Sequence, residues 1–139
     1  MGNGKKVAVI GAGLCGLKCA NELENQGISV TVFEKSRGIG GRLANRRTRT
    51  GLTFDHGAQY VTARNKPFTE YLNLAIENGF AANWVFCDAD DLKSKKIRIV
   101  GTNGMSDLPR PLSQGLKIHF ESEIKNIQKI NQRWALTIG

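Results

Sequence analysis

The sequence predicts an α/β fold built on a parallel sheet, and two observations indicate it. From Val7 to Glu34 the chain has the pattern of a strand, a glycine turn, a helix and a second strand. Near the other end, residues 122–130 and 133–138 alternate polar and apolar side chains around Asn131-Gln132, which is typical of a β-hairpin. A parallel strand pair joined by a helix, with an added hairpin, is therefore expected.

The first strand and its turn carry a nucleotide-binding pattern. Residues 6–10 are a short, mostly apolar run, typical of a strand buried on both faces. Gly11, Gly13 and Gly16 follow in the spacing G-x-G-x-x-G. In this motif the first glycine permits the tight turn, the second lets the backbone approach a pyrophosphate, and the third allows close helix–sheet packing. The start of the helix also directs unpaired N–H groups at phosphates.

A helix and a second strand complete the unit. Residues 14–26 have helical spacing of Leu and Ala, Gly27 is suited to the C-terminal cap, and residues 28–33 predict a buried strand. Glu34 ends that strand, about 20 residues after the glycines, where a carboxylate accepts hydrogen bonds from an adenosine ribose. The pattern predicts dinucleotide binding. The alternative, a βαβ unit without a ligand, leaves the three glycines unexplained.

Composition sets the broad class. The chain has 139 residues, 40% hydrophobic and 23% charged, as expected for a single globular domain. It contains no apolar run that could span a bilayer and no signal-peptide core, so we expect a cytoplasmic protein without a membrane partner. Cys15, Cys19 and Cys87 have neither metal-ligand nor C-x-x-C spacing, which favours buried free thiols and no metal site.

Basic residues concentrate in the first part of the chain. Residues 1–50 hold nine Lys/Arg against three acids, which accounts for +6 of the net charge of +8. No nucleic-acid-binding module is recognisable, so we expect some arginines to meet cofactor phosphates and the rest to be solvated, with no nucleic-acid partner. Gly38, Gly40 and Gly41 predict a backbone nest for an anion, and Arg42 follows with a guanidinium that clamps phosphate.

Three segments together resemble a known family. GAGLCG (11–16), VFEKSRGIGGR (32–42) and FDHGAQY (54–60) look like the flavin-dependent amine oxidase superfamily, and within it the renalase-like NAD/FAD-dependent oxidoreductases. The resemblance runs over nearly the whole chain and is strongest over residues 7–64. It implies a Rossmann-like FAD/NAD(P)-binding fold with ββα additions and the hairpin, spanning 1–139 as one domain, with 80–105 as the start of a small substrate-domain sheet.

The resemblance also implies FAD, held non-covalently in extended form. It places the pyrophosphate at the glycine turn, the ribose at Glu34 and the diphosphate at Arg42. The isoalloxazine ring follows Gly57 to Tyr60, and the backbone of Ile124 meets the adenine edge. The predicted cofactor-binding residues are Gly11, Ala12, Gly13, Leu14, Cys15, Gly16, Glu34, Lys35, Gly40, Gly41, Arg42, His56, Gly57, Ala58, Gln59, Tyr60 and Ile124. No catalytic residue is predicted, and His56 is interpreted as solvated or structural rather than as a base.

The rest of the chain predicts a second helix over 67–78 and two strands over 83–87 and 96–100, joined by a turn at 88–95. The aromatic side chains there are expected to pack rather than to form a substrate cage. Ser106 is predicted as a helix N-cap, and Pro111 should shorten the helix that follows. Residues 117–120 predict a strand that returns to the parallel sheet.

The family's chains are much longer than this one, which leaves three interpretations open: a fragment of a flavin oxidoreductase, an FAD-binding subunit completed by another chain, or a binding module without turnover. In each case we expect an open sheet edge that a partner or a second copy can cover. The completed enzyme is expected to transfer hydride from a dihydronicotinamide or an amine to flavin N5, with oxygen as acceptor. NAD alone is the weaker alternative, since it needs neither the GGR loop nor the GAQY segment.

Overall fold

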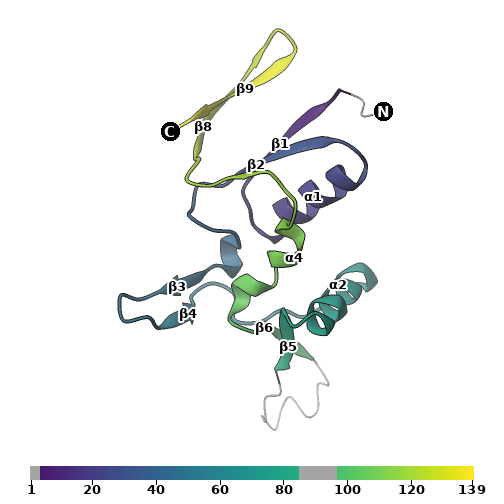
Figure 1. Cartoon of the computed structure of the whole chain (residues 1–139), viewed down its shortest axis with the longest axis vertical. Helices are drawn as coiled ribbons and strands as arrows, with labels where there is room; N and C mark the ends of the chain where they lie inside the picture. Colours follow the sequence, from purple (N-terminus) through teal and green to yellow (C-terminus); the bar gives the residue numbers. More distant parts are fainter. Residues whose placement is uncertain (1–3, 85–96) are drawn as a thin grey trace. The chain divides into compact units, whose positions relative to one another are not determined.

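The computed structural model describes residues 4–84 and 97–139, which divide into two compact units. The first unit contains the chain up to Gly41 together with Leu112–Gly139, and the second contains Arg42–Pro111. Figure 1 shows the elements of each. The segment 80–105, predicted to begin a small separate sheet, lies within the second unit, which starts earlier in the chain.

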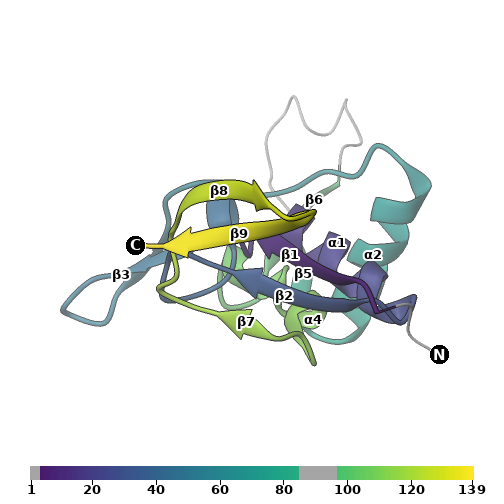
Figure 2. The ribbon, with the colours of Figure 1, turned by 90° about the horizontal axis from the view of Figure 1, so that it is seen from above.

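The first unit is built on a parallel sheet, as predicted. β1 (Lys6–Ile10) pairs in parallel with β2 (Ser29–Phe33), and β2 pairs in parallel with the short strand β7 (Ile118–His119). Figure 2 shows the three strands side by side in the order β1-β2-β7. The returning strand expected over 117–120 is therefore confirmed.

The helix α1 (Leu14–Asn25) connects β1 to β2 and packs its apolar side inward: Leu17 and Ala20 have no exposed surface. At its end Gly27 has φ +75°, and Ile28 N–H donates to the carbonyl of Leu23 at 3.0 Å. This is the six-to-one bond of a Schellman cap, which confirms the predicted role of Gly27.

The prediction that β1 is buried on both faces is wrong. Its residues alternate between exposed and half-buried, and Ile10 is 51% exposed. The Val9 face meets α1, because a Cβ placed on Gly16 would lie 3.5 Å from Val9 Cγ1. The Ile10 face lacks a comparable cover, and within the described sheet β1 pairs only with β2. The expected open sheet edge is therefore present.

The predicted hairpin is confirmed. β8 (Ile124–Ile130) pairs antiparallel with β9 (Arg133–Ile138). Asn131 and Gln132 have φ of 46° and 63°, the pair of positive values that a two-residue type I′ turn requires. Apolar side chains of the hairpin remain exposed, Trp134 the most at 68%.

The second unit combines short strands and helices. Its elements, with those that cross its boundaries, are η1 (Gly41–Leu43), β3 (Asn45–Arg47), β4 (Thr53–Asp55), α2 (Lys66–Glu77), β5 (Ala81–Trp84), β6 (Arg98–Gly101), η2 (Met105–Asp107) and α4 (Arg110–Ser113). α2 confirms the predicted second helix; its N-cap is Asn65, whose side chain accepts a hydrogen bond from Phe68 N–H at 3.0 Å. β5 and β6 pair antiparallel, which confirms the two predicted strands with shifted bounds. Residues 85–87, Cys87 included, and the turn predicted at 88–95 lie outside the described residues.

Three sequence-based expectations for local structure need correction. Ser106 is not an N-cap: it lies inside the 3₁₀ helix η2, whose N-cap is Gly104. The segment 45–47, for which the sequence predicts no strand, forms β3, paired with β4. Cys15 and Cys19 are free, as expected, but exposed instead of buried, because they lie on the side of α1 away from the sheet. The expected shortening at Pro111 is confirmed by the four-residue helix α4.

Among the described residues, no helix is both long enough and apolar enough to cross a lipid bilayer.

The glycine at position 16 should be essential for stability. A Cβ there would lie 2.1 Å from the carbonyl oxygen of Gly11, so Gly16→Ala forces α1 away from β1. We expect the free energy of unfolding to fall by about 2 kcal/mol, the usual cost of overpacking a tight contact. Gly38→Ala is the matched control, because a Cβ there meets no atom within 4 Å. Equal urea midpoints for the two variants would contradict the packing role of Gly16.

Candidate functional site

A buried carboxylate joins the glycine turn to the end of β2. Glu34 is 6% exposed, and its Oε2 accepts a hydrogen bond from Ala12 N–H at 2.6 Å. Its Oε1 accepts another from Ser36 N–H at 2.8 Å. Ala12 itself is fully buried, so its N–H needs a partner within the protein. Glu34, which is predicted to bind the ribose, therefore also holds the glycine turn in place.

The same hydrogen bonds set the charge state of Glu34. Burial favours the neutral acid, but the N–H groups of Ala12 and Ser36, with the positive charge of Lys35, outweigh it and lower the pKa of Glu34 below its ordinary value. The side chain is thus an anion at neutral pH. A carboxylate offers about four lone-pair positions. The two backbone donors leave capacity for hydroxyl groups of a ligand.

The start of α1 is free of side-chain caps. Its N-cap is Gly13, no side chain caps it, and the first turn contains no acidic residue. The first N–H groups of a helix have no partner within the helix. Uncapped donors and the positive end of the helix dipole together form a site suited to phosphate.

The loop after β2 returns to this turn. Gly40 N–H donates to Ala12 carbonyl at 2.9 Å, and Gly13 and Gly40 form an isolated parallel bridge. Gly40 and Gly41 have φ of 122° and 56°, as the predicted nest requires, whereas Gly38 does not have positive φ. A Cβ on Gly41 would lie 3.3 Å from Gly13 Cα, so the two glycine segments are in close contact.

The other predicted residues of the first unit are neighbours in sequence of the glycine turn and Glu34, or lie on the hairpin. Leu14 is half-buried, and Cys15 and Lys35 are exposed. Ile124 is the first residue of β8, two positions after Ser122, whose N–H donates to the carbonyl of Glu34 at 2.9 Å. The chain before the hairpin is therefore attached to the residue predicted to bind the ribose.

The remaining predicted residues belong to the second unit, where backbone contacts bring two of the segments together. The carbonyl of Arg42 accepts a hydrogen bond from Ala58 N–H at 2.9 Å. A Cβ on Gly57 would lie 2.1 Å from that same oxygen. Gly57 is therefore required by packing against Arg42, whether or not a ligand is bound. The Arg42 side chain is exposed.

His56, Gln59 and Tyr60 are exposed. The guanidinium of Arg98 lies 4.9 Å from the centre of the Tyr60 ring and 5.8 Å from that of Trp84. The two rings are 5.8 Å apart and tilted by 57°. Such cation–π contacts stabilise the position of the Tyr60 ring, and they confirm that Trp84 packs against neighbouring side chains.

Sequence reasoning missed the polar network that precedes this segment. Asp55 Oδ1 accepts hydrogen bonds from Asn45 Nδ2 and from Met105 N–H, both at 2.9 Å. Asn45 Oδ1 in turn accepts one from Ser106 N–H at 2.9 Å. The network joins β3, β4 and the start of η2, and it holds the chain one residue before His56. The sequence holds only a weak signal for this network, because Asn45 lies in a strand of three residues that is too short to recognise from its pattern.

Comparison with known proteins supports the nucleotide-binding interpretation. Residues 9–74 match the family model described as NAD(P)-binding Rossmann-like domain. The 4,4′-diapophytoene desaturase (4,4′-diaponeurosporene-forming) of Staphylococcus aureus strain Newman is 40% identical over 79 residues. The same enzyme of strain MRSA252 is 48% identical over 79 residues. Each alignment covers 50% of this chain but only 16% of the relative, so the chain spans a small part of their length.

Among solved structures, a protein from Exiguobacterium sp. 255-15, provisionally assigned as a protoporphyrinogen oxidase, superposes with a TM-score of 0.72 and 12% identity. The match covers 99% of this chain and 57% of that one, and at this identity it shows the fold alone. The predicted Rossmann-like fold class is thereby confirmed. Residues 9–74 are therefore similar to NAD(P)-binding Rossmann-like domains, and part of the chain is similar in sequence to the desaturases.

Stability should depend on the ionisation of Glu34. Because its folded pKa is lowered, its contribution is present above the unfolded pKa of about 4.5 and is lost as the pH falls through the folded pKa. Glu34→Gln should lower the free energy of unfolding by about 2 kcal/mol at pH 7, since one backbone N–H loses its acceptor. The gap to wild type should close in acid. Glu22→Gln, at an exposed position, is the control. Parallel pH profiles of urea unfolding for wild type and Glu34→Gln would contradict this role.

Proposed function

We propose that the chain is the FAD-binding module of a flavin-dependent oxidoreductase, similar to the renalase-like enzymes. The family model and the desaturase relatives support a dinucleotide site in an oxidoreductase. FAD rather than NAD is favoured by the second glycine segment, Gly40–Gly41, which is bonded to the first. We also propose that the protein is located in the cytoplasm.

The conformation of Gly13 carries the proposal. Its φ of −76° and ψ of 171° are open to any residue, and a Cβ there would meet nothing closer than Gly41 Cα at 3.9 Å. Neither the backbone nor packing therefore requires glycine, in contrast to Gly16. A pyrophosphate that lies against the backbone is the remaining requirement, because a Cβ would occupy its place.

The described residues fit FAD when each unit is considered by itself. In the first unit, the uncapped start of α1 suits the pyrophosphate and Glu34 retains acceptor capacity for ribose hydroxyls. Ile124 offers backbone groups for the adenine edge. In the second unit, exposed Arg42 suits a phosphate, and the segment 57–60 offers backbone N–H groups for the polar edge of the isoalloxazine ring.

Bound FAD would supply the hydride-accepting chemistry, with a dihydronicotinamide or an amine as the proposed reductant and oxygen as the final acceptor. The described residues contribute binding and orientation. Glu34 is anionic and holds its hydrogen-bond acceptors fixed, and the Arg42 carbonyl fixes Gly57 and Ala58. We assign no acid or base on this chain.

A second candidate is a dinucleotide-binding subunit that acts only with a partner chain. The open edge of β1 and the exposed Trp134 and Ile138 favour it, because such surfaces are usually covered. Flavin absorbance retained after desalting, without turnover of dihydronicotinamides or amines, would support this candidate over a self-sufficient enzyme.

Gly13→Ala should separate binding from folding. We expect urea stability within about 1 kcal/mol of wild type, since the added Cβ makes only ordinary van der Waals contact. FAD affinity, measured by titration calorimetry, should fall by at least about tenfold, or about 1.4 kcal/mol. NAD is titrated in parallel. Unchanged FAD affinity in Gly13→Ala, or tighter binding of NAD than of FAD to wild type, would contradict the proposal.

Arg42→Ala should weaken FAD binding in a salt-dependent way. Loss of an exposed charge-assisted hydrogen bond to phosphate is expected to cost about tenfold in affinity at low salt. The difference should shrink at 1 M salt, where the Debye length is about 3 Å. The control is Arg46→Ala, which removes an arginine that is also exposed but lies on β3. A salt-independent loss, or an equal loss in Arg46→Ala, would exclude the phosphate contact.

A further inference from the structure

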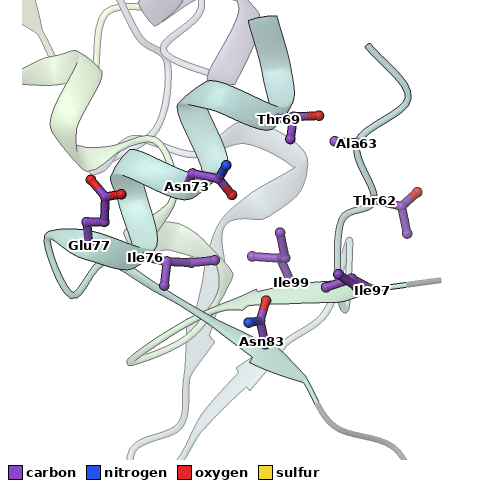
Figure 3. A pocket seen from close by; sticks show the side chains of 9 residues that line it. All are labelled: Thr62, Ala63, Thr69, Asn73, Ile76, Glu77, Asn83, Ile97 and Ile99. Carbon is purple, nitrogen blue, oxygen red and sulfur yellow. The ribbon is translucent and has the colours of Figure 1, made fainter. Parts of the chain in front are cut away.

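The second unit contains a pocket of about 550 Å³ between α2 and the β5–β6 strands. This volume is within the range of small-molecule sites, about 300–1,000 Å³. Figure 3 shows the nine residues that line it: Thr62, Ala63, Thr69, Asn73, Ile76, Glu77, Asn83, Ile97 and Ile99. All belong to the second unit, and none is among the residues predicted to contact the dinucleotide.

One side of the pocket is apolar. Ile99 is 7% exposed and forms part of the core, whereas Ile97, two residues earlier, is 65% exposed. In Figure 3 the Ile76 side chain extends from α2 toward Ile99 on β6, and Ile97 immediately precedes that strand. An apolar group packed here would contact all three side chains and remove the exposed hydrocarbon of Ile97 from water, which stabilises a bound ligand.

The polar side chains around this surface have unused hydrogen-bonding capacity. Within residues 4–84 and 97–139, the side chains of Asn73, Glu77 and Asn83 make no hydrogen bond or ion pair. Thr69 is already engaged, with its hydroxyl donating to the Asn65 carbonyl at 2.9 Å. Two amides and a carboxylate therefore remain available to a ligand around the three isoleucines.

Charge decides the class of ligand. Glu77 is the only charged residue among the nine described residues that line the pocket, and it is an acid in a chain of net charge +8. In Figure 3 it lies at one end of the pocket, with Thr62 at the far side. A carboxylate beside an apolar surface favours a ligand with a positive end and a hydrocarbon body. An anion would meet the carboxylate without a described cation in the lining to compensate.

We propose that this pocket binds a small organic cation with an apolar body. The hydrocarbon packs on Ile76, Ile97 and Ile99, the ammonium group pairs with Glu77, and the amides of Asn73 and Asn83 accept or donate the remaining hydrogen bonds. The site is separate in its residues from the proposed flavin site and does not depend on FAD.

The test is a titration of the full chain with cyclohexylammonium, followed by NMR of ¹³C-labelled isoleucine δ1-methyl groups. Saturable shifts are expected at Ile76, Ile97 and Ile99, with Ile127 and Ile130 on the exposed hairpin as internal references. Cyclohexanol and cyclohexanecarboxylate, of similar shape, should bind more weakly than the cation. Shifts of equal size at the hairpin, a lack of saturation, or equal binding of cyclohexanol would overturn the proposal.

Substitution of the carboxylate completes the test. Glu77→Gln should weaken cyclohexylammonium binding by about threefold to fivefold, the effect of one partly exposed ion pair, and leave cyclohexanol binding unchanged. Glu70→Gln is the matched control, because Glu70 is on the same helix, outside the pocket, and pairs with Lys66 at 3.8 Å. The methyl spectra report whether both variants are folded. Equal effects of the two substitutions would exclude Glu77 as the recognition group.

Discussion

The hydrogen bond from Ala12 N–H to the Glu34 carboxylate is the interaction on which the first unit depends. It joins the turn after β1 to the residue that follows β2, so the parallel pair, the start of α1 and the loop at Gly40 are held at one point. A buried anion is costly unless it is hydrogen-bonded, and here two backbone donors compensate for burial. The same carboxylate thus serves the fold and the proposed ligand.

The second unit combines an apolar core, which includes Leu72, Met105 and Leu108, with polar contacts that fix its loops. The Arg42 carbonyl fixes Gly57 and Ala58, and Asp55 joins Asn45 to Met105. Each of these groups satisfies a partner that would otherwise be unpaired. Consequently the segment 56–60 can keep exposed side chains on a backbone that is held from both sides. Exposed side chains on a fixed backbone are what a ligand-contacting segment needs.

Local sequence patterns predicted the elements with strong signals. Lys6–Ile10, the helix from Leu14, and the hairpin around Asn131-Gln132 were found with bounds accurate to within two residues. Weak signals were missed. β3 is three residues long and has no alternation of apolar and polar residues. It forms because its pairing with β4 and the hydrogen bond between Asn45 and Asp55 stabilise it. The exposure of Cys15 and Cys19 was also missed, since the spacing of the cysteines favoured buried free thiols.

The sequence by itself determined the βαβ unit, its glycine motif and the terminal acid. These features depend on local periodicity and on glycines at a fixed spacing, both of which can be read along the chain. Tertiary structure decided why each glycine is needed. At Gly16 and Gly57 an added Cβ would lie 2.1 Å from a carbonyl oxygen, whereas at Gly13 it would make only ordinary van der Waals contact at 3.9 Å. It also decided that one face of β1 stays exposed, and it gathered side chains of α2, β5, β6 and the segment before α2 around a pocket. Contacts between residues distant in sequence are set by packing, which no local pattern records.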